Sequence, residues 1–166
     1  NFKLALQSIQ LLKKHIPNFK FFLAGEDMTR RNKELISMIK FYNLEKDVIL
    51  LGEIKNMPKL YNSLDLTIMT SSYGEAFPNV LAESMSCGIP CISTNIGDAS
   101  NIVGKYGWIC NSYSPNIFKT YLIKAINLKK NNHKKWINLK KNCRVRIESK
   151  FSLKAMLENY QNLIKK

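Results

Sequence analysis

Short apolar runs alternate with longer amphipathic stretches along this chain, and the alternation predicts its secondary structure. The apolar runs predict strands at 19–24, 48–51, 66–70, 90–94 and 108–110. The amphipathic stretches predict helices at 2–15, 30–42, 57–63, 78–87, 115–128, 131–148 and 152–164. Strands this short and apolar are typical of a parallel sheet buried on both faces, and their alternation with helices favours a Rossmann-like α/β fold with right-handed crossovers.

Ligands of such sheets bind beyond the carboxyl ends of the strands. Gly25 and Gly52 each follow a predicted strand, and so do the loops 71–77 and 94–100. The two glycines can simply form the turns that end the strands, or they can allow a ligand to approach the backbone closely. This edge of the sheet is therefore where we expect a binding site.

Composition indicates one folded domain. A chain of 166 residues with 45% hydrophobic content buries about 70% of its unfolded surface, so it needs no disulfide or metal for stability. No apolar run approaches the roughly 20 residues of a membrane span. The pattern of residues 1–15 predicts an amphipathic helix and is not typical of a secretion signal. We therefore expect a cytoplasmic protein.

The four cysteines lack the paired spacing of metal ligands, and neither of the two histidines is near Cys87 or Cys91. We expect all four to be reduced, and a zinc site on Cys87 and Cys91 is the less favoured alternative. No metal and no cofactor is expected.

The most specific pattern lies between Gly74 and Ile92. Glu75 and Glu83 stand on either side of Pro78, which is predicted to be the first residue of a helix because its missing N–H costs nothing there. Gly88 is predicted to end that helix. Acidic residues are common near helix starts for electrostatic reasons alone, but the surrounding glycine, proline and strand context favours a binding site.

The start of this helix offers two kinds of recognition. The early backbone N–H groups, those of Phe77, Asn79 and Val80, lack partners inside the helix and form a site for an anion such as a diphosphate. Glu83 lies five residues past Pro78, roughly 7.5 Å along the axis, and helical side chains lean toward the N-terminus. An ionised carboxylate only accepts hydrogen bonds, so paired hydroxyls such as those of a ribose are its natural partner. The pattern suits a sugar nucleotide.

These residues resemble a known family. Glu75 to Glu83, with Phe77 and Pro78 between them and the turn 86–90 after them, resembles the Glu-x7-Glu signature of the retaining GT-B glycosyltransferases of family GT4. The segments 21–25, 48–52, 57–61 and 64–71 resemble the strands and short helix that lead to that signature. In that family this is the C-terminal, donor-binding half of a two-domain enzyme, which implies that residues 1–166 are this half without the N-terminal acceptor domain.

The resemblance implies transfer of a sugar from a nucleotide diphosphate sugar to a hydroxyl acceptor with retention of configuration, in surface polysaccharide or glycolipid synthesis. It implies that Glu75 is the catalytic residue, at a hydroxyl of the donor sugar, and that Glu83 holds the ribose. The remaining donor-binding residues that it implies are Phe77, Pro78, Asn79, Val80, Leu81, Gly25, Gly52, Glu53, Ile54 and Leu60.

Two features depart from the family pattern. The chain opens on a predicted helix, whereas the family has a strand before it and a loop whose arginine and lysine neutralise the diphosphate. The isolated chain is therefore expected to bind donor weakly and to transfer nothing. After Gly97, Asn101 stands where the family often has a glutamate, which weakens any role assigned to that position.

The formal charge of +14 leaves three interpretations open. The basic residues concentrate after Lys119, in and around the last predicted helices, namely Lys129, Lys130, Lys134, Lys135, Lys140, Lys141, Arg144, Arg146, Lys150 and Lys154. They can form a solvated face, bind an anionic membrane that presents a lipid-linked acceptor, or contact nucleic acid. No nucleic acid is expected, because no aromatic stacking platform accompanies the charge. The alternative functions are a noncatalytic sugar-nucleotide-binding module and a basic nucleic-acid-associated domain.

Overall fold

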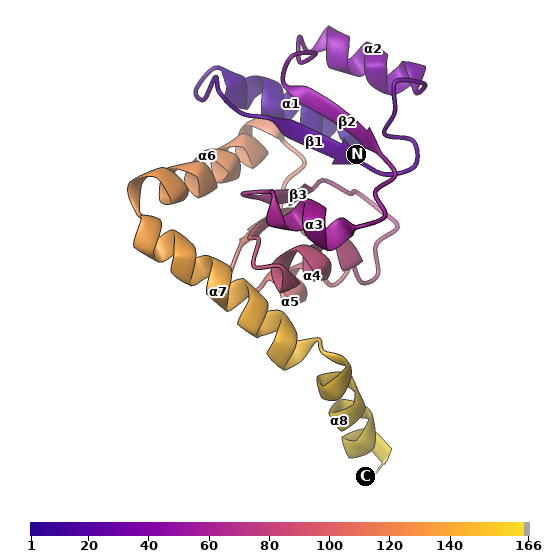
Figure 1. Ribbon diagram of the computed structural model, residues 1–166, viewed down its shortest axis with the longest axis vertical. Coiled ribbons are helices and arrows are strands. Elements are labelled where there is room, and N and C mark those ends of the chain that lie inside the picture. Colours follow the sequence, from indigo (N-terminus) through magenta and orange to yellow (C-terminus); the bar gives the residue numbers. More distant parts are fainter. Residues whose placement is uncertain (165–166) are drawn as a thin grey trace.

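The computed structural model describes residues 1–164 and shows an α/β fold in which helices flank parallel strands (Figure 1). The strands are β1 Phe21–Ala24, β2 Val48–Gly52, β3 Thr67–Met69, β4 Cys91–Thr94 and β5 Trp108–Cys110. The helices are α1 Phe2–Lys13, α2 Lys33–Phe41, α3 Met57–Asn62, α4 Asn79–Ser86, α5 Ala99–Val103, α6 Pro115–Asn131, α7 His133–Lys150 and α8 Leu153–Ile164. Every strand and helix that the hydrophobic pattern predicts is present, with ends shifted by up to three residues.

The strands do not form the single sheet that the sequence predicts. β1 pairs with β2, and β3, β4 and β5 pair in that order, so the parallel ladders fall into two groups. Paired strands must lie about 4.8 Å apart for their backbone groups to meet, and within residues 1–164 no strand joins β1 to β3. The two groups are held together by their helices and apolar core instead.

Two apolar clusters hold the helices against the strands. In the first, Leu6 of α1, Leu35 of α2 and Phe118 of α6 are fully buried around β1. In the second, α4, α5 and α7 pack together through Leu81 and Met85, which are both fully buried. The second cluster therefore fixes α4, the helix that carries Glu83.

The start of α4 differs by one residue from the prediction. Pro78 is the N-cap, with φ −71° and ψ 93°, and the helix begins at Asn79. Proline suits this place because its restricted φ is compatible with extended backbone, and its carbonyl accepts from the Leu81 N–H at 3.0 Å. The open N–H groups of the helix end are therefore those of Asn79 and Val80.

Residues 94–100 were predicted to be a loop, and from Ala99 on this was wrong, because helix α5 begins there. The helix has only five residues, too short for a period of 3.6 to show in the sequence. Its stability comes from burial of Ala99, Ile102 and Val103 in the second cluster. Just before it, the Asp98 N–H donates to the Ala76 carbonyl at 2.9 Å. The start of α5 thus supports the loop that carries Glu75.

All four cysteines carry free thiols. Cys91 and Cys143 are fully buried, and burial raises the pKa of each thiol to about 12. Within residues 1–164, no cluster of three or more histidine, cysteine or acidic side chains is placed to hold a metal ion.

The last helix, α8, extends away from the other elements at the end of α7 (Figure 1). None of its residues is buried, and its exposed apolar side chains include Leu153, Met156, Leu157, Tyr160 and Leu163. Among residues 1–164, no helix combines the length and the apolar character needed to cross a membrane.

Gly97 closely approaches the loop between β3 and α4, which carries Glu75 and is called the motif loop below. Replacing this glycine by alanine tests the close approach. Gly97 has φ +52°, and a Cβ there would lie 2.3 Å from the carbonyl oxygen of Glu75. We expect Gly97→Ala to lower the free energy of unfolding in urea by roughly 2 kcal/mol or more, since both backbone strain and a clash with backbone oppose it. Gly74→Ala is the control, because Gly74 also has positive φ but open space around it. Equal losses in the two variants would contradict the role of the close approach.

Candidate functional site

The two motif glutamates lie in consecutive parts of the chain, the loop between β3 and α4 and α4 itself. Glu75 lies in this loop and is half-buried, whereas Glu83 lies on α4 and is exposed. Each carboxylate accepts a hydrogen bond from a hydroxyl of an earlier part of the chain. The two acceptors therefore have defined positions in the folded chain.

Glu83 is held by Tyr61. The Tyr61 hydroxyl, on α3, donates to Glu83 Oε2 at 3.1 Å, and the Tyr61 side chain is only 3% exposed. Burial first, and then the charge of Glu83, raise the pKa of Tyr61 above its ordinary value, so the phenol stays protonated and donates. Within residues 1–164, the other oxygen of Glu83, Oε1, accepts no hydrogen bond and is available to a ligand.

Sequence reasoning missed Tyr61 and chose its neighbour Leu60. The segment 57–61 carried a family resemblance, but nothing in it shows which side chain faces α4. An aromatic hydroxyl at the end of a short helix was the available signal, since buried tyrosines usually find a polar partner.

Glu75 is held by Ser71. The Ser71 hydroxyl donates to Glu75 Oε1 at 2.9 Å. The carbonyl of Ser71 in turn accepts from the hydroxyl of Thr94, a buried residue at the end of β4, at 2.6 Å. This chain of hydrogen bonds ties the motif loop to the middle strand of its sheet. Sequence reasoning missed both hydroxyl residues, because their partners lie across the fold.

The residues at the start of α4 divide into exposed and buried ones. Asn79 is exposed and Val80 is half-buried, whereas Pro78 and Leu81 are buried. Leu81 can therefore meet a ligand only through its backbone. The side chain of Phe77 packs against Phe151, with ring centroids 5.7 Å apart, which links the motif to the end of α7.

The other predicted site residues lie at two places. Gly25 and Gly52 are side by side, because the Gly25 N–H donates to the Gly52 carbonyl at 2.8 Å. Glu53 is exposed and Ile54 half-buried directly after β2. Leu60 lines one cavity together with Glu75 and Val80. Asn101 donates to Asp98 at 3.1 Å and so supports its own helix.

The site combines two acceptors, the carboxylates of Glu75 and Glu83, with the hydrogen-bond donors at the start of α4. Glu75 lies four residues before the first residue of α4, and Glu83 is the fifth residue of this helix, whose free N–H groups and dipole attract negative charge at its start. Such a site can take a ligand that carries both an anionic group and neutral hydroxyls.

Comparisons with known proteins agree with this geometry. Over 155 residues the chain is 25% identical to the UDP-Gal:alpha-D-GlcNAc-diphosphoundecaprenol alpha-1,3-galactosyltransferase of Escherichia coli, covering 89% of this chain and 37% of that protein. The crystal structure of a glycosyltransferase from Rickettsia africae matches with a TM-score of 0.84 and 19% identity, covering 98% of this chain and 43% of that one. Anabaena Alr3699/HepE, in complex with UDP and glucose, matches with a TM-score of 0.76 and 23% identity over 97% of this chain and 44% of that one.

The chain thus spans less than half the length of each of these proteins. The two structural matches show a shared GT-B fold. Residues 1–143, most of the chain, match the family model described as Glycosyl transferases group 1. The chain belongs to the group 1 glycosyl transferases.

Proposed function

We propose that this chain is the C-terminal, donor-binding half of a retaining glycosyltransferase that moves a sugar from a nucleotide diphosphate sugar to a hydroxyl acceptor. The observation that carries the proposal is the pair of hydroxyl-anchored carboxylates around the start of α4. The family of the chain supports it. The E. coli relative is named for a diphosphoundecaprenol acceptor, which supports a role in surface polysaccharide or glycolipid synthesis.

Each part of the site has a role in this proposal. Glu83 accepts from the ribose hydroxyls through its free oxygen, and Glu75 accepts from a hydroxyl of the donor sugar. The N–H groups of Asn79 and Val80 meet the diphosphate and stabilise the charge that develops on it as it leaves. These groups neutralise charge without a metal, and we propose that none is required. The backbone of Phe77, Pro78 and Leu81, the glycines Gly25 and Gly52, and Glu53, Ile54 and Leu60 complete the contacts to the nucleotide.

A noncatalytic sugar-nucleotide-binding module is the alternative. It would use the same contacts, so binding alone cannot separate the two functions. Transfer by the full-length protein, followed as release of nucleoside diphosphate in the presence of acceptor, separates them.

Glu83 provides the sharpest test of donor binding. Glu83→Gln keeps the size of the side chain but removes its charge, and we expect the Kd for UDP to rise at least tenfold, because a hydrogen bond to a charged group contributes about 1.5–3 kcal/mol. Inorganic pyrophosphate lacks the ribose, so its Kd should not rise. Amide shifts of residues 77–81 during NMR titrations with UDP, GDP and ADP measure both effects and identify the base.

Glu34→Gln is the matched control, since Glu34 lies on α2 in the other part of the fold. A wild-type chain that binds pyrophosphate but no nucleotide at millimolar concentration would contradict the proposed donor site. An equal loss of UDP and pyrophosphate in Glu83→Gln would contradict the ribose contact.

We further propose that the basic surface of α6 and α7 attaches the protein to the cytoplasmic face of an anionic membrane. On α7, exposed Lys134 and Lys141 share a stripe with the exposed apolar residues Ile137 and Val145, and Lys130 is exposed at the end of α6. Apolar side chains between lysines are typical of helices that lie at a membrane surface. Such a location would bring the donor site to a lipid-linked acceptor.

Replacing Lys134 and Lys141 together by alanine should weaken binding to vesicles that contain phosphatidylglycerol by about 30-fold, since each lysine near such a surface contributes about 1 kcal/mol. Co-sedimentation at two salt concentrations measures the change. The control variant replaces Lys33 and Lys40 of α2, which are also exposed. Equal binding to vesicles of phosphatidylcholine alone, or equal loss in the control, would contradict the proposal.

A further inference from the structure

Arg146 of α7 is half-buried, and its guanidinium group is bound within the fold. Its Nε donates to the Ile102 carbonyl at 2.8 Å, and a second nitrogen donates to the Asn101 carbonyl. Both carbonyls belong to the last turn of α5, where an arginine can satisfy carbonyls that lack a partner in the helix. Gly104 leaves room for this contact, since a Cβ there would lie 2.6 Å from the guanidinium carbon. Arg146 therefore fastens α7 to the end of α5.

Phe151 directly follows α7 and joins this helix to the motif loop. Its ring packs against the ring of Phe77, with centroids 5.7 Å apart and an interplanar angle of 56°. The guanidinium carbon of Arg146 lies 6.0 Å from the centroid of the Phe151 ring. Both contacts are attractive, because aromatic rings favour tilted packing and their faces attract cations. Arg146 is thus in contact with α5 and with the aromatic pair that reaches the motif loop.

The start of α5 holds the motif loop at a second point. The Asp98 N–H donates to the Ala76 carbonyl at 2.9 Å. Gly97 packs directly against the carbonyl oxygens of Glu75 and Ala76. One end of α5 is therefore joined to the motif loop, and its other end is joined to Arg146.

These contacts connect the motif loop, α5 and the end of α7 in a closed circuit, which we call the clamp. In Figure 1 the end of α7 lies beside α4 and α5, and the three helices share one apolar cluster. The clamp closes at Ala76 and Phe77, directly before Pro78 and α4. A loop held at two points has its binding groups in place before a ligand arrives, so binding need not order them.

We propose that Arg146 and Phe151 are positioning residues of the donor site, which hold the motif loop so that its backbone and the start of α4 meet the diphosphate. The proposal rests on the proposed function. Neither side chain contacts the donor in it. Arg144, two residues earlier, is instead exposed and pairs with Glu148 of its own helix at 2.7 Å. The role of Arg146 therefore comes from its partners and not from its charge alone.

Two substitutions loosen the clamp. Arg146→Lys keeps the charge but loses the planar fork that donates to two carbonyls, and Phe151→Leu removes the aromatic contact. We expect each to raise the Kd for UDP and the Kd for pyrophosphate alike, by about fivefold, as is typical of substitutions that act on a site without touching its ligand. NMR titrations that follow residues 77–81 measure both constants. The matched controls are Arg144→Lys and Phe41→Leu, which make the same changes at exposed side chains away from the motif loop.

Amide hydrogen exchange reports on the clamp without any ligand. The Asp98 N–H is bonded to the motif loop, so its exchange should become at least about threefold faster in both clamp variants, as expected for easier local opening. The Tyr42 N–H, which donates to the Met38 carbonyl at 3.1 Å, should be unaffected. Equal acceleration at Asp98 and Tyr42 would show a general loss of stability and would overturn the clamp. Unchanged exchange at Asp98 would overturn it as well.

The binding results separate a positioning role from a structural one. Faster exchange at Asp98 with both Kd values unchanged would mean that the clamp only stabilises the fold, and would overturn its role in the donor site. The same holds for a rise in the Kd for UDP without a rise in the Kd for pyrophosphate. A wild-type chain that binds neither ligand would overturn the proposed function together with this role, whereas normal wild-type binding with unaffected variants would overturn the role alone.

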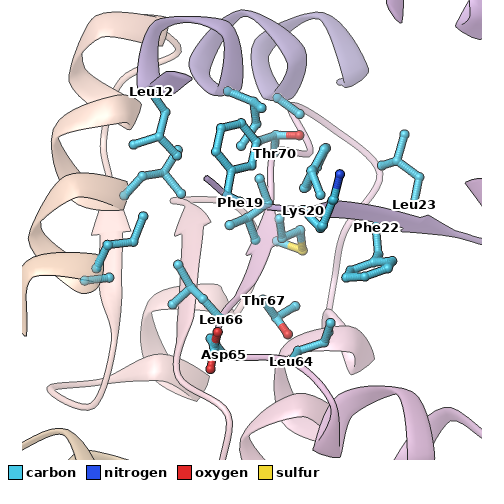
Figure 2. A pocket seen from close by; sticks show the side chains of 18 of the residues that line it. Leu12, Phe19, Lys20, Phe22, Leu23, Leu64, Asp65, Leu66, Thr67 and Thr70 are labelled. Carbon is cyan, nitrogen blue, oxygen red and sulfur yellow. The ribbon is translucent and has the colours of Figure 1, made fainter. Parts of the chain in front are cut away.

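A separate observation concerns Glu83 and also rests on the proposed function. A cavity of about 740 Å³ lies between β1 and β3, and Tyr61 lines it together with Leu64 and Thr67, which Figure 2 shows on the same side. The Thr67 hydroxyl accepts from the buried hydroxyl of Ser84 at 2.7 Å, which ties α4 to β3 directly beside Glu83. The backbone of Glu83 is therefore fixed next to the Tyr61 hydroxyl.

The side chain of Glu83 is fixed by the phenol. The hydroxyl of Tyr61, which is buried, donates to Oε2 at 3.1 Å, while Oε1 accepts no hydrogen bond within residues 1–164. We infer that Tyr61 is a positioning residue: its hydroxyl holds one oxygen of Glu83 so that the other faces the ribose. A glutamate side chain on an exposed helix face otherwise samples several rotamers, and binding would have to fix them.

Tyr61→Phe keeps the buried ring and removes only the hydroxyl. We expect the Kd for UDP to rise about fivefold or more, as for the loss of one hydrogen bond to a charged group, with the Kd for pyrophosphate unchanged, in contrast to the clamp variants. In the double variant with Glu83→Gln the two effects should not add, because both act on one contact. Tyr42→Phe is the control, since Tyr42 is also buried but follows α2.

The outcomes separate the role of Tyr61 from the proposed function. Unchanged UDP affinity in Tyr61→Phe, beside a clear loss in Glu83→Gln, would overturn the role of Tyr61 and leave the donor site intact. Additive effects would also overturn it. A wild-type chain that binds no nucleotide would overturn both.

Discussion

Burial of the inner face of α4 is the constraint on which the rest of the site depends. Leu81 and Met85 are fully buried in one cluster with Ile102 of α5 and Cys143 of α7. Burial of each such side chain contributes about 2 kcal/mol, so rotation or displacement of the helix would be costly. Because the inner face is fixed, the helix also fixes the orientation of its outer face, which carries Glu83, and of the open N–H groups at its start. In the proposed function, recognition of a nucleotide therefore depends on the packing of side chains that do not contact it.

The two carboxylates differ in how the fold holds them. Glu83 is set by a buried phenol from α3, whereas Glu75 is set by Ser71, whose own backbone is tied to the end of β4. Both hydroxyl groups are neutral donors, so they orient the carboxylates without cancelling their charge. Each glutamate therefore remains a strong acceptor toward a ligand hydroxyl. The two carboxylates accompany the positive end of a helix dipole, so the site suits a ligand that carries both neutral hydroxyls and an anionic group.

Much of the fold could be predicted from the hydrophobic pattern, and the exceptions have physical causes. The five strands are local apolar runs, and the long helices show a clear apolar face, so both appear in the sequence. Helix α5 was missed because its five residues are held by packing against α4 and β5, which no local pattern records. The single predicted sheet is divided into two groups, because strand pairing depends on which strands lie side by side after folding and the sequence pattern does not record this. Pro78 was placed one residue too far inside α4, since the first helical position and the cap both suit proline.

The sequence by itself determined the order of strands and helices, the spacing of Glu75 and Glu83 around a helix start, and the family to which the motif points. These properties depend on residues close together in the chain, and periodicity and turn chemistry report them directly. Only the tertiary structure decided that Tyr61 and Ser71 hold the two carboxylates, that Gly97 packs against the motif loop, and that β1 and β3 face each other across a cavity. Each of these joins residues from separate elements, and such contacts are set by the simultaneous packing of all the helices around the core.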